Sequence, residues 1–207
     1  MKTKILFAAV LALLFLSSCE KDYYDKLKGG QSSQGEVGVT ISSTSLEIAG
    51  VSSINGEVIS LKDGISTISG SAQVTNSNIR NIVSNFRGAE VDGNTVTISD
   101  LKFKATDEGI AAVTGLAEGI IVKYDAEPGD EYKTVDGVRT VVSRSVDDDY
   151  MYGFFLIKVI EVRENLNKYG VKQIRYWANH RFGLVGIEFT FDDNSVARYP
   201  VYFSVEN

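Results

Sequence analysis

The stretch Val91-Asp92-Gly93-Asn94-Thr95-Val96-Thr97-Ile98 has the pattern of a β-hairpin, and it decides the fold class of the chain. The dipeptide Asp92-Gly93 supplies the positive φ angles that a tight turn needs. After the turn, Val96 and Ile98 alternate with threonines, which is the two-residue period of a half-buried strand. The stretch therefore predicts two short antiparallel strands.

The sequence on the N-terminal side of this hairpin repeats the pattern. Residues 37–41 alternate in polarity, and Asn55-Gly56 and Lys62-Asp63-Gly64 are turn signals between further β-type runs. The chain has 19 glycines and only 2 prolines. Ser, Thr, Val and Ile recur in short runs, as they do in strands. These features predict an all-β fold.

The hairpin stretch is followed by Gly109-Ile110-Ala111-Ala112-Val113-Thr114, which reads as a closing strand. Together the two segments resemble the bacterial Ig-like domains of secreted and surface proteins, over residues 37–118. The resemblance implies a β-sandwich, with two antiparallel sheets packed face to face. Residues Leu101–Glu108 depart from the family pattern and are predicted to form a long loop.

The segment 77–86 carries two conflicting signals. Ile79, Ile82, Val83 and Phe86 fall on one face of a helix. The Ig-like resemblance instead implies a loop followed by a strand. Because ten residues between β runs make only a marginal helix, we predict loop and strand here.

Composition changes after Leu116 and marks a second unit at 119–207. Of the 21 aromatic residues in the chain, 15 lie between Gly119 and Asn207. Apolar runs separated by polar turns predict an antiparallel meander. Its predicted strands are Ile120–Tyr124, Val138–Val146, Tyr150–Val162, Val171–Ala178, Leu184–Phe191 and Val196–Val205. The predicted fold is an Ig-like β-sandwich followed by this antiparallel β-meander unit.

Alternation along the last strands assigns residues to faces, because successive side chains of a strand point to opposite sides. One face of 184–191 is predicted to be core, with Val185, Ile187, Phe189 and Phe191. The opposite face carries Glu188. On the preceding strand, Gln173, Arg175 and Trp177 lie opposite an apolar set.

Trp177, Arg175, Gln173 and Glu188 are therefore the predicted ligand-binding residues. An exposed indole beside planar hydrogen-bonding groups suits stacking with a sugar ring or with a partner's side chain. The alternative is that Trp177 packs under a loop or against the first unit, since large aromatic side chains are usually well buried.

The first residues predict a targeting segment. Lys2 and Lys4 precede an apolar run that is too short to span a bilayer. The run ends in Leu16-Ser17-Ser18-Cys19, which resembles the bacterial lipobox. The resemblance implies a signal peptide at 1–18, acylation of Cys19 and attachment to the outer membrane. The segment 19–36 is predicted to be a lipid-anchored tether. Its charged start resembles the surface-export signal of Bacteroidota lipoproteins, which implies display at the cell surface.

Charge narrows the classes of partner. Without residues 1–18 the chain keeps 19 cations against 27 acids, a net charge of −8. An acidic protein repels nucleic acid and anionic lipid, so no nucleic-acid partner is expected. Cys19 is the only cysteine of the chain, so no disulfide is expected either.

No catalytic constellation stands out. His180 is the single histidine, and it sits in a predicted turn beside Arg181, which disfavours the imidazolium of a Ser-His-Asp mechanism. One histidine and a lipidated cysteine make a poor zinc site. Acidic runs could bind calcium between loops, although none has EF-hand spacing. They are Asp147-Asp148-Asp149, Asp192-Asp193 and the group Asp125, Glu127, Asp130 and Glu131. We expect no catalytic residue, no metal site and no cofactor.

A haem carrier is a further alternative. The run Val159–Phe191 faintly resembles the C-terminal hairpin of HmuY-like haem-carrier lipoproteins. Only His180 and Met151 are available as iron ligands, whereas that family uses a pair of histidines or related residues.

The sequence thus predicts a non-enzymatic envelope lipoprotein that binds a glycan or another envelope protein. The alternative is a structural subunit or spacer of a surface or adhesive assembly. An unpaired sheet edge or a stable oligomer would favour this second interpretation.

Overall fold

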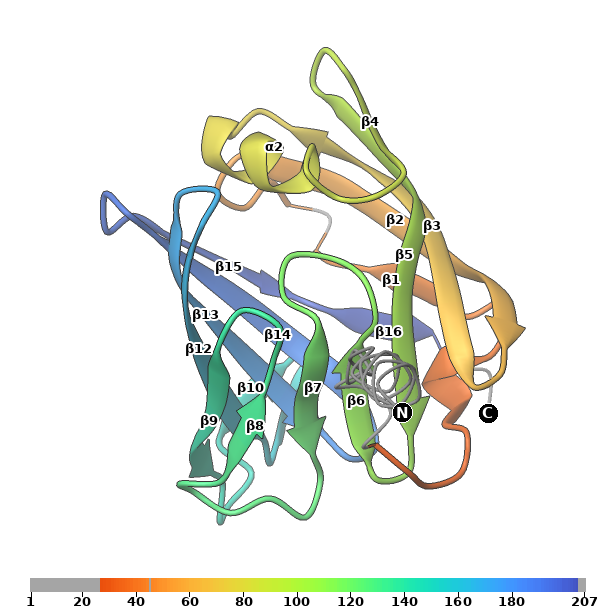
Figure 1. Cartoon of the computed structure of the whole chain (residues 1–207), viewed down its shortest axis with the longest axis vertical. Coiled ribbons are helices and arrows are strands. Elements are labelled where there is room, and N and C mark those ends of the chain that lie inside the picture. The colour runs from red at the N-terminus through yellow and green to blue at the C-terminus, as the bar shows by residue number, and fades with distance from the viewer. Residues whose placement is uncertain (1–26, 45, 205–207) are drawn as a thin grey trace, which may run out of the picture.

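The computed structural model describes residues 27–44 and 46–204, and it confirms the all-β prediction. The first sheet is a curled antiparallel half-barrel of eight strands in the order β16-β1-β2-β3-β5-β6-β7, with β4 paired to β5 (Figure 1). Its strands are β1 (Thr40–Ser42), β2 (Val51–Lys62), β3 (Ile65–Val74), β4 (Ala89–Asp92), β5 (Thr95–Thr106), β6 (Gly109–Ala112), β7 (Gly119–Lys123) and β16 (Tyr202–Ser204).

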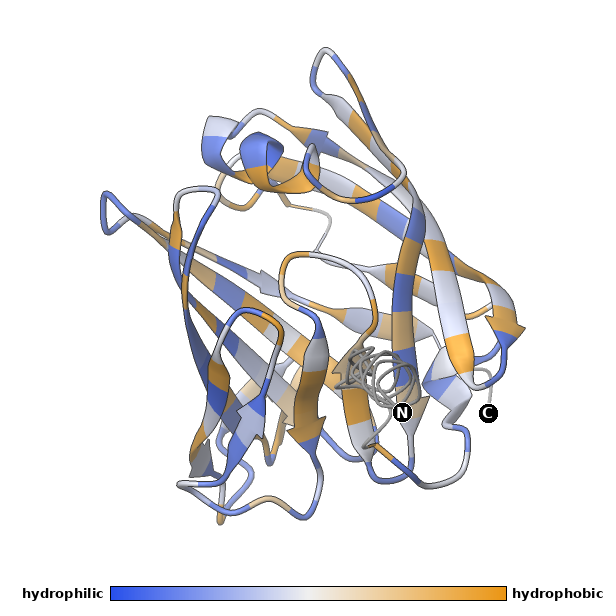
Figure 2. Cartoon of the chain, in the orientation of Figure 1, coloured by the Kyte–Doolittle hydropathy of each residue, from blue (hydrophilic) through white to orange (hydrophobic). Residues whose placement is uncertain are grey.

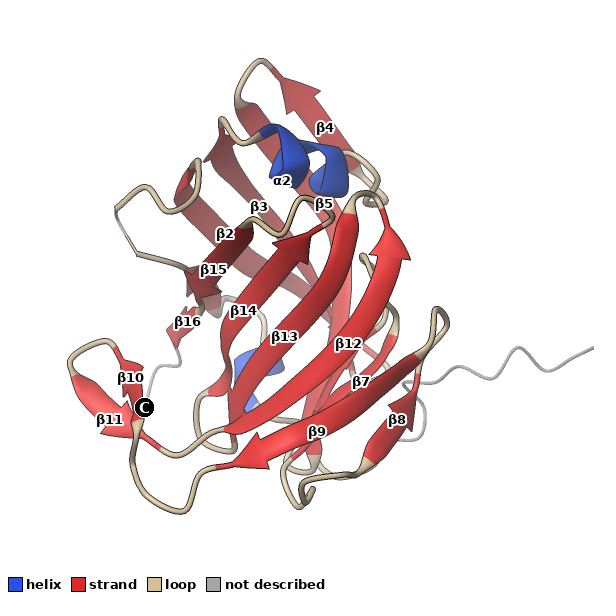
Figure 3. Ribbon diagram, turned by 90° about the vertical axis from the view of Figure 1, so that its left-hand side faces the viewer, coloured by secondary structure: helices blue, strands red, loops and turns tan. Residues whose placement is uncertain are grey.

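The second sheet is an antiparallel meander of six strands, in the order β15-β14-β13-β12-β9-β8. Its strands are β8 (Glu131–Lys133), β9 (Val138–Arg144), β12 (Ile160–Lys168), β13 (Val171–Asn179), β14 (Gly183–Phe191) and β15 (Val196–Pro200). A separate hairpin, β10 (Tyr150–Tyr152) and β11 (Phe155–Ile157), stands off its lower end in Figure 3. The predicted meander is confirmed in part: residues 150–157 form this hairpin instead, and β7 and β16, which were predicted as meander strands, pair in the first sheet.

The two sheets adjoin along two seams. At one seam β7 lies beside β8, and the amide of Val135 donates to the carbonyl of Glu118. At the other seam the chain passes directly from β15 to β16, and the amide of Val201 donates to the carbonyl of Val185 on β14. Joined at both seams, the sheets enclose the interior of the molecule between them (Figures 1 and 3).

The Ig-like prediction for 37–118 differs from this arrangement. Strands β1 to β6 all pair within the first sheet, so this segment does not supply two facing sheets. The opposite layer comes from β8, β9 and β12 to β15, while β7 and β16 extend the first sheet. Hydrogen bonding therefore crosses the predicted boundary at residue 118.

Two turn predictions in the first sheet are confirmed. Asp92-Gly93 joins β4 to β5, and Gly93 has the positive φ of 58° that the turn requires. Asp63-Gly64 joins β2 to β3, with φ angles of 52° and 75°.

Two other turn and loop predictions are wrong. Asn55-Gly56 lies inside β2, because Gly56 pairs with Gly70 of β3 at a close approach of the two backbones. The predicted loop Leu101–Glu108 is mostly strand, since β5 continues to Thr106. Phe103 and Ala105 are buried on one side of it, so two-residue alternation continued through this segment.

The prediction of loop and strand for 77–86 is also wrong, because α2 spans Ser77–Val83. The side chain of Asn76 caps its first turn and accepts hydrogen bonds from the amides of Asn78 and Ile79, at 2.9 and 3.1 Å. Ile79 and Ile82 are buried against the sheets. The cap and the apolar face together stabilise a helix that is too short to form by itself.

Of the predicted tether 19–36, the structure describes residues 27–36, and these pack on the first sheet. Leu27 is completely buried in the core. The amide of Ser32 donates to the carbonyl of Ala105, and the side-chain amide of Gln34 donates to the carbonyl of Arg181 at 2.7 Å. Residues 27–36 are therefore part of the folded body.

The predicted faces of the meander are correct apart from Val185. Ile174, Tyr176 and Ala178 are buried in the main core, with Phe191 from β14. Val185 instead packs with Trp177 in a separate cluster. The pairing of β13 with β14 shifts between Trp177 and Ala178, and such a bulge moves a side chain to the other face of a strand.

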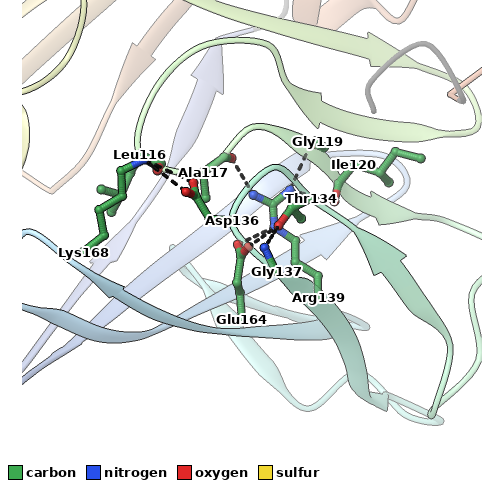
Figure 4. A network of polar contacts seen from close by, with 10 residues as sticks. All are labelled: Leu116, Ala117, Gly119, Ile120, Thr134, Asp136, Gly137, Arg139, Glu164 and Lys168. Carbon is green, nitrogen blue, oxygen red and sulfur yellow. Dashed lines mark hydrogen bonds and ion pairs between the residues drawn. The ribbon is translucent and has the colours of Figure 1, made fainter. Parts of the chain in front are cut away.

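A buried ion pair fastens the seam between β7 and β8 (Figure 4). Arg139 on β9 and Glu164 on β12 have completely buried side chains, with Nε and Oε2 2.7 Å apart. The guanidinium also donates to the main-chain carbonyls at the entry to β7, which are those of Ala117, Gly119 and Ile120. Arg139 thus connects the second sheet to the edge strand of the first.

In the part of the chain that the structure describes, no helix is long and apolar enough to cross a membrane.

Candidate functional site

Trp177 is buried in the structure, with a side chain only 6% exposed. The β10–β11 hairpin covers it, and the ring of Tyr150 lies 6.1 Å from the indole ring. The guanidinium of Arg198 lies 4.0 Å from the indole centroid on the outer face of the sheet. This is the alternative arrangement that the sequence left open, with the tryptophan packed under neighbouring structure. The indole cannot act as an open stacking platform.

The other three predicted binding residues come together on the outer face of the second sheet. Arg175 Nε donates to Gln173 Oε1 at 3.0 Å and lies 3.9 Å from Glu188 Oε1. Arg175 Nη1 lies 3.4 Å from Glu161 Oε1. The Arg175 side chain is 40% exposed, so this polar cluster is accessible to solvent.

The hairpin next to this cluster exposes apolar side chains. Met151, Phe154, Phe155 and Leu156 are all exposed, and Phe154 is fully so. Exposed apolar side chains in a group are typical of surfaces that bind a partner.

His180 is exposed in the turn between β13 and β14, and Met151 is 66% exposed on β10. The turn is organised by Asn179, whose side-chain oxygen accepts from the amides of Arg181 and Phe182. Both residues that the haem interpretation requires therefore lie at the surface.

The acidic runs form ordinary turn contacts. Asp149 accepts from the hydroxyl of Ser145, Asp130 from the amide of Glu127, and Asp193 from Ser195. Among residues 27–44 and 46–204, no group of three or more His, Cys, Asp or Glu side chains could hold a metal ion. Cys19 lies outside the described residues.

The feature that stands out in the interior is a pair of adjoining apolar cavities between the two sheets, of about 250 and 270 Å³. Both are lined by Ile41, Ile68, Leu101 and Phe189, so they share a wall. The first extends toward α2, where Ile79 and Val83 line it. An apolar cavity of roughly 150 Å³ is large enough to bind a molecule of the size of benzene, and each of these two is larger.

Small residues on β2 and β3 help to create this space. Gly56, Gly70 and Ala72 line the first cavity and contribute little or no side-chain volume to it. In Figure 2 hydrophobic residues alternate with hydrophilic ones along the strands around the interior. The hydrophobic residues that face the cavity include Ile54, Ile98 and Phe189, and all three are only partly buried. The sheets thus enclose apolar surface without packing it completely.

Among the described residues that line the two cavities, only Lys102 is charged. Its ammonium group is paired with Asp100 at 2.8 Å, and this hydrogen bond lowers the pKa of Asp100. A cavity with such walls favours apolar ligands, because an ion moved from water into it would lose its hydration without a counter-charge.

Tyr199 on β15 contributes apolar surface to the wall of the first cavity. Its side chain is only 6% exposed, and its hydroxyl is buried without a hydrogen-bond partner. Burial raises the pKa of Tyr199 to about 12. The hydroxyl is therefore neutral at physiological pH.

Sequence reasoning missed this site. Strand alternation marks Ile54, Ile68, Ile98 and Phe189 as inward-facing, but it cannot distinguish a packed interior from a hollow one. The available signal was the glycine inside each of two adjacent strands, since glycine within a strand marks a bulge or a close backbone approach.

No family model, curated protein or solved structure matches this chain.

Proposed function

We propose that this protein is a non-enzymatic envelope lipoprotein, anchored in the outer membrane through acylated Cys19 and displayed at the cell surface, that binds an apolar molecule between its two sheets. The observation that carries the ligand class is the apolar double cavity. The lipobox resemblance of residues 16–19 supports the anchor. Ligand sites are usually concave and mostly apolar, with a few polar groups that fix orientation.

The side chains that line the cavities support binding rather than catalysis. Among the described residues that line the two cavities there is no Asp, Glu or His side chain, and the exposed His180 lies in a turn. An apolar cargo also suits a protein of the envelope, where acyl chains and other apolar molecules must cross water.

A cavity-filling experiment tests the proposal. The probe is N-phenylnaphthylamine, a neutral dye that fluoresces in apolar sites, and the protein is the chain from residue 19 with Cys19→Ser, which retains every described residue. We expect saturable binding to this protein. Ala72→Leu combined with Ala112→Leu, one substitution in each cavity, should weaken dye binding at least about tenfold, because the added side chains occupy the space.

The matched control is Ala89→Leu on β4, which lies outside both cavities and should bind dye like the parent protein. The thermal transition of the double variant should be unchanged or higher, since filling a void adds packing contacts. Dye binding that survives both substitutions would place the ligand elsewhere and reject the proposal.

A second candidate is binding of a glycan or of another envelope protein on the outer face of the second sheet, with the protein acting as a spacer or subunit of a surface assembly. The specific observation in its favour is the accessible cluster of Arg175, Gln173 and Glu188 beside the exposed apolar hairpin. In this candidate Trp177 packs beneath the β10–β11 hairpin and does not contact the ligand.

Arg175→Ala and Phe154→Ser test this second candidate separately. Each should reduce binding to immobilised glycans, or to one purified envelope partner, by about fivefold or more, with little change in the thermal transition because both side chains are accessible. Trp177→Ala, by contrast, should lower the transition because it empties a buried cluster. Unchanged glycan and partner binding in both surface variants would argue against this face.

A further inference from the structure

Both cavities lie along one strand of the first sheet. Val96, Ile98 and Leu101 of β5 line the first cavity, and Leu101, Phe103 and Ala105 of the same strand line the second. Ala105 follows Val96 by nine residues, which at about 3.3 Å per residue span roughly 30 Å. In Figure 1 this strand runs along the long axis of the molecule. Volumes of about 250 and 270 Å³ distributed over such a length make a narrow, elongated space.

The boundary between the two cavities is formed by residues on facing sheets. The residues that line both cavities are Ile41 of β1, Ile68 of β3, Leu101 of β5 and Phe189 of β14. The first three belong to the first sheet and Phe189 belongs to the second. All four are only partly buried, although they lie in the interior. Side chains rather than a strand therefore separate the cavities, and side chains can change rotamer while the strands stay in place.

We propose that the ligand between the sheets is a single unbranched, uncharged hydrocarbon chain that lies along β5 and occupies both cavities. The inference rests on the proposed function, because it requires that the cavities bind an apolar molecule. It adds the shape of that molecule. A narrow space of this length accepts an extended chain, whereas a compact apolar molecule fills one cavity at most. The chain passes between Leu101 and Phe189, whose side chains rotate to admit it.

The test compares uncharged alcohols by their displacement of N-phenylnaphthylamine from the Cys19→Ser chain. The ligands are 1-hexanol, 1-octanol, 1-decanol, 1-dodecanol and cyclododecanol, each with one hydroxyl group, so that differences report the hydrocarbon part. Affinity should rise about three- to fourfold for each added CH₂ group through 1-dodecanol, because every added group is buried. At equal carbon number, 1-dodecanol should bind at least about tenfold more tightly than its compact ring isologue cyclododecanol.

Two single variants separate the cavities. Ala72→Leu narrows only the first, and Ala112→Leu narrows only the second. A cavity of roughly 150 Å³ holds the six carbons of benzene, so 1-hexanol needs only one cavity and should bind each variant within about twofold of the parent. 1-Dodecanol needs both, so each variant should bind it at least about tenfold more weakly. Retained hexanol binding shows that a variant is folded, and Ala89→Leu, outside both cavities, is the control.

The possible failures are distinct. If affinity stops rising beyond 1-hexanol, if cyclododecanol binds as tightly as 1-dodecanol, or if either single variant keeps full affinity for 1-dodecanol, the ligand does not span both cavities. This inference is then rejected, while binding of the dye and of 1-hexanol leaves the proposed function standing. If the parent protein binds neither the dye nor any of the alcohols, the proposed function is rejected together with this inference.

Discussion

Replacing Glu164 with leucine is expected to lower the free energy of unfolding by about 3–5 kcal/mol, because it leaves the Arg139 guanidinium buried without its counter-charge. Both side chains of the pair are completely buried, and the Nε–Oε2 distance is 2.7 Å. The substitution also removes the acceptor of the hydroxyl of Thr134, which donates to Glu164 Oε1 at 2.7 Å. Chemical denaturation of the two proteins measures the difference.

The control is the exposed ion pair a short distance away. Asp136→Asn breaks the contact between Asp136 and Lys168, which is 3.2 Å long and partly exposed, and should cost less than about 1 kcal/mol. The double variant Arg139→Met with Glu164→Leu should recover part of the loss but not all of it. Removing both charges relieves the unpaired guanidinium, yet the carbonyls of Ala117, Gly119 and Ile120 lose their donor. If Glu164→Leu lowered the free energy of unfolding by less than about 1 kcal/mol, the ion pair would not stabilise the seam as described.

Gly70→Ala is expected to cost about 1–3 kcal/mol although it adds a single methyl group. A Cβ atom at this position would lie 2.6 Å from the carbonyl oxygen of Asn55 and 2.9 Å from the Cα of Gly56. Both contacts are with the backbone of β2, which cannot move aside without disturbing the pairing of β2 with β3. Thermal and chemical unfolding of the variant measure the effect.

Gly56→Ala on the facing strand is the matched control. Its Cβ would meet nothing closer than Ile68 Cγ2 at 3.4 Å, so a smaller loss is expected. If the two alanine variants were equally stable, the close approach of β2 and β3 at Gly70 would not be what makes alanine unfavourable there.

The local signals in the sequence predicted much of this fold. The Asp92-Gly93 and Asp63-Gly64 turns, the all-β class and most strands of the meander follow from turn chemistry and two-residue alternation, which act over a few neighbouring residues. The helix at 77–83 could have been predicted if the capping residue Asn76 had been given more weight than the family resemblance. Its cap and its apolar face were both visible in the sequence.

What could not be predicted depends on contacts between distant residues. Local patterns do not show that β16 pairs in the first sheet and not in the second. They also do not show that a bulge opposite Trp177 places Val185 on the outer face of the second sheet. For the same reason, alternation placed Arg175 and Gln173 on one face correctly but could not show that a hairpin covers Trp177. The double cavity depends on how far apart the two sheets are held, and no short segment encodes that distance.

The pairing of β1 with β16 has a consequence for how the protein folds. Thr40 lies opposite Ser204, so the two partners are 164 positions apart in the chain. During folding β1 must therefore keep an unpaired edge until residues 202–204 reach it, and an edge of this kind can recruit strands from other molecules. Closure of this seam between strands so distant along the chain is expected to be slow. Refolding chains should therefore aggregate most readily before β16 has paired with β1.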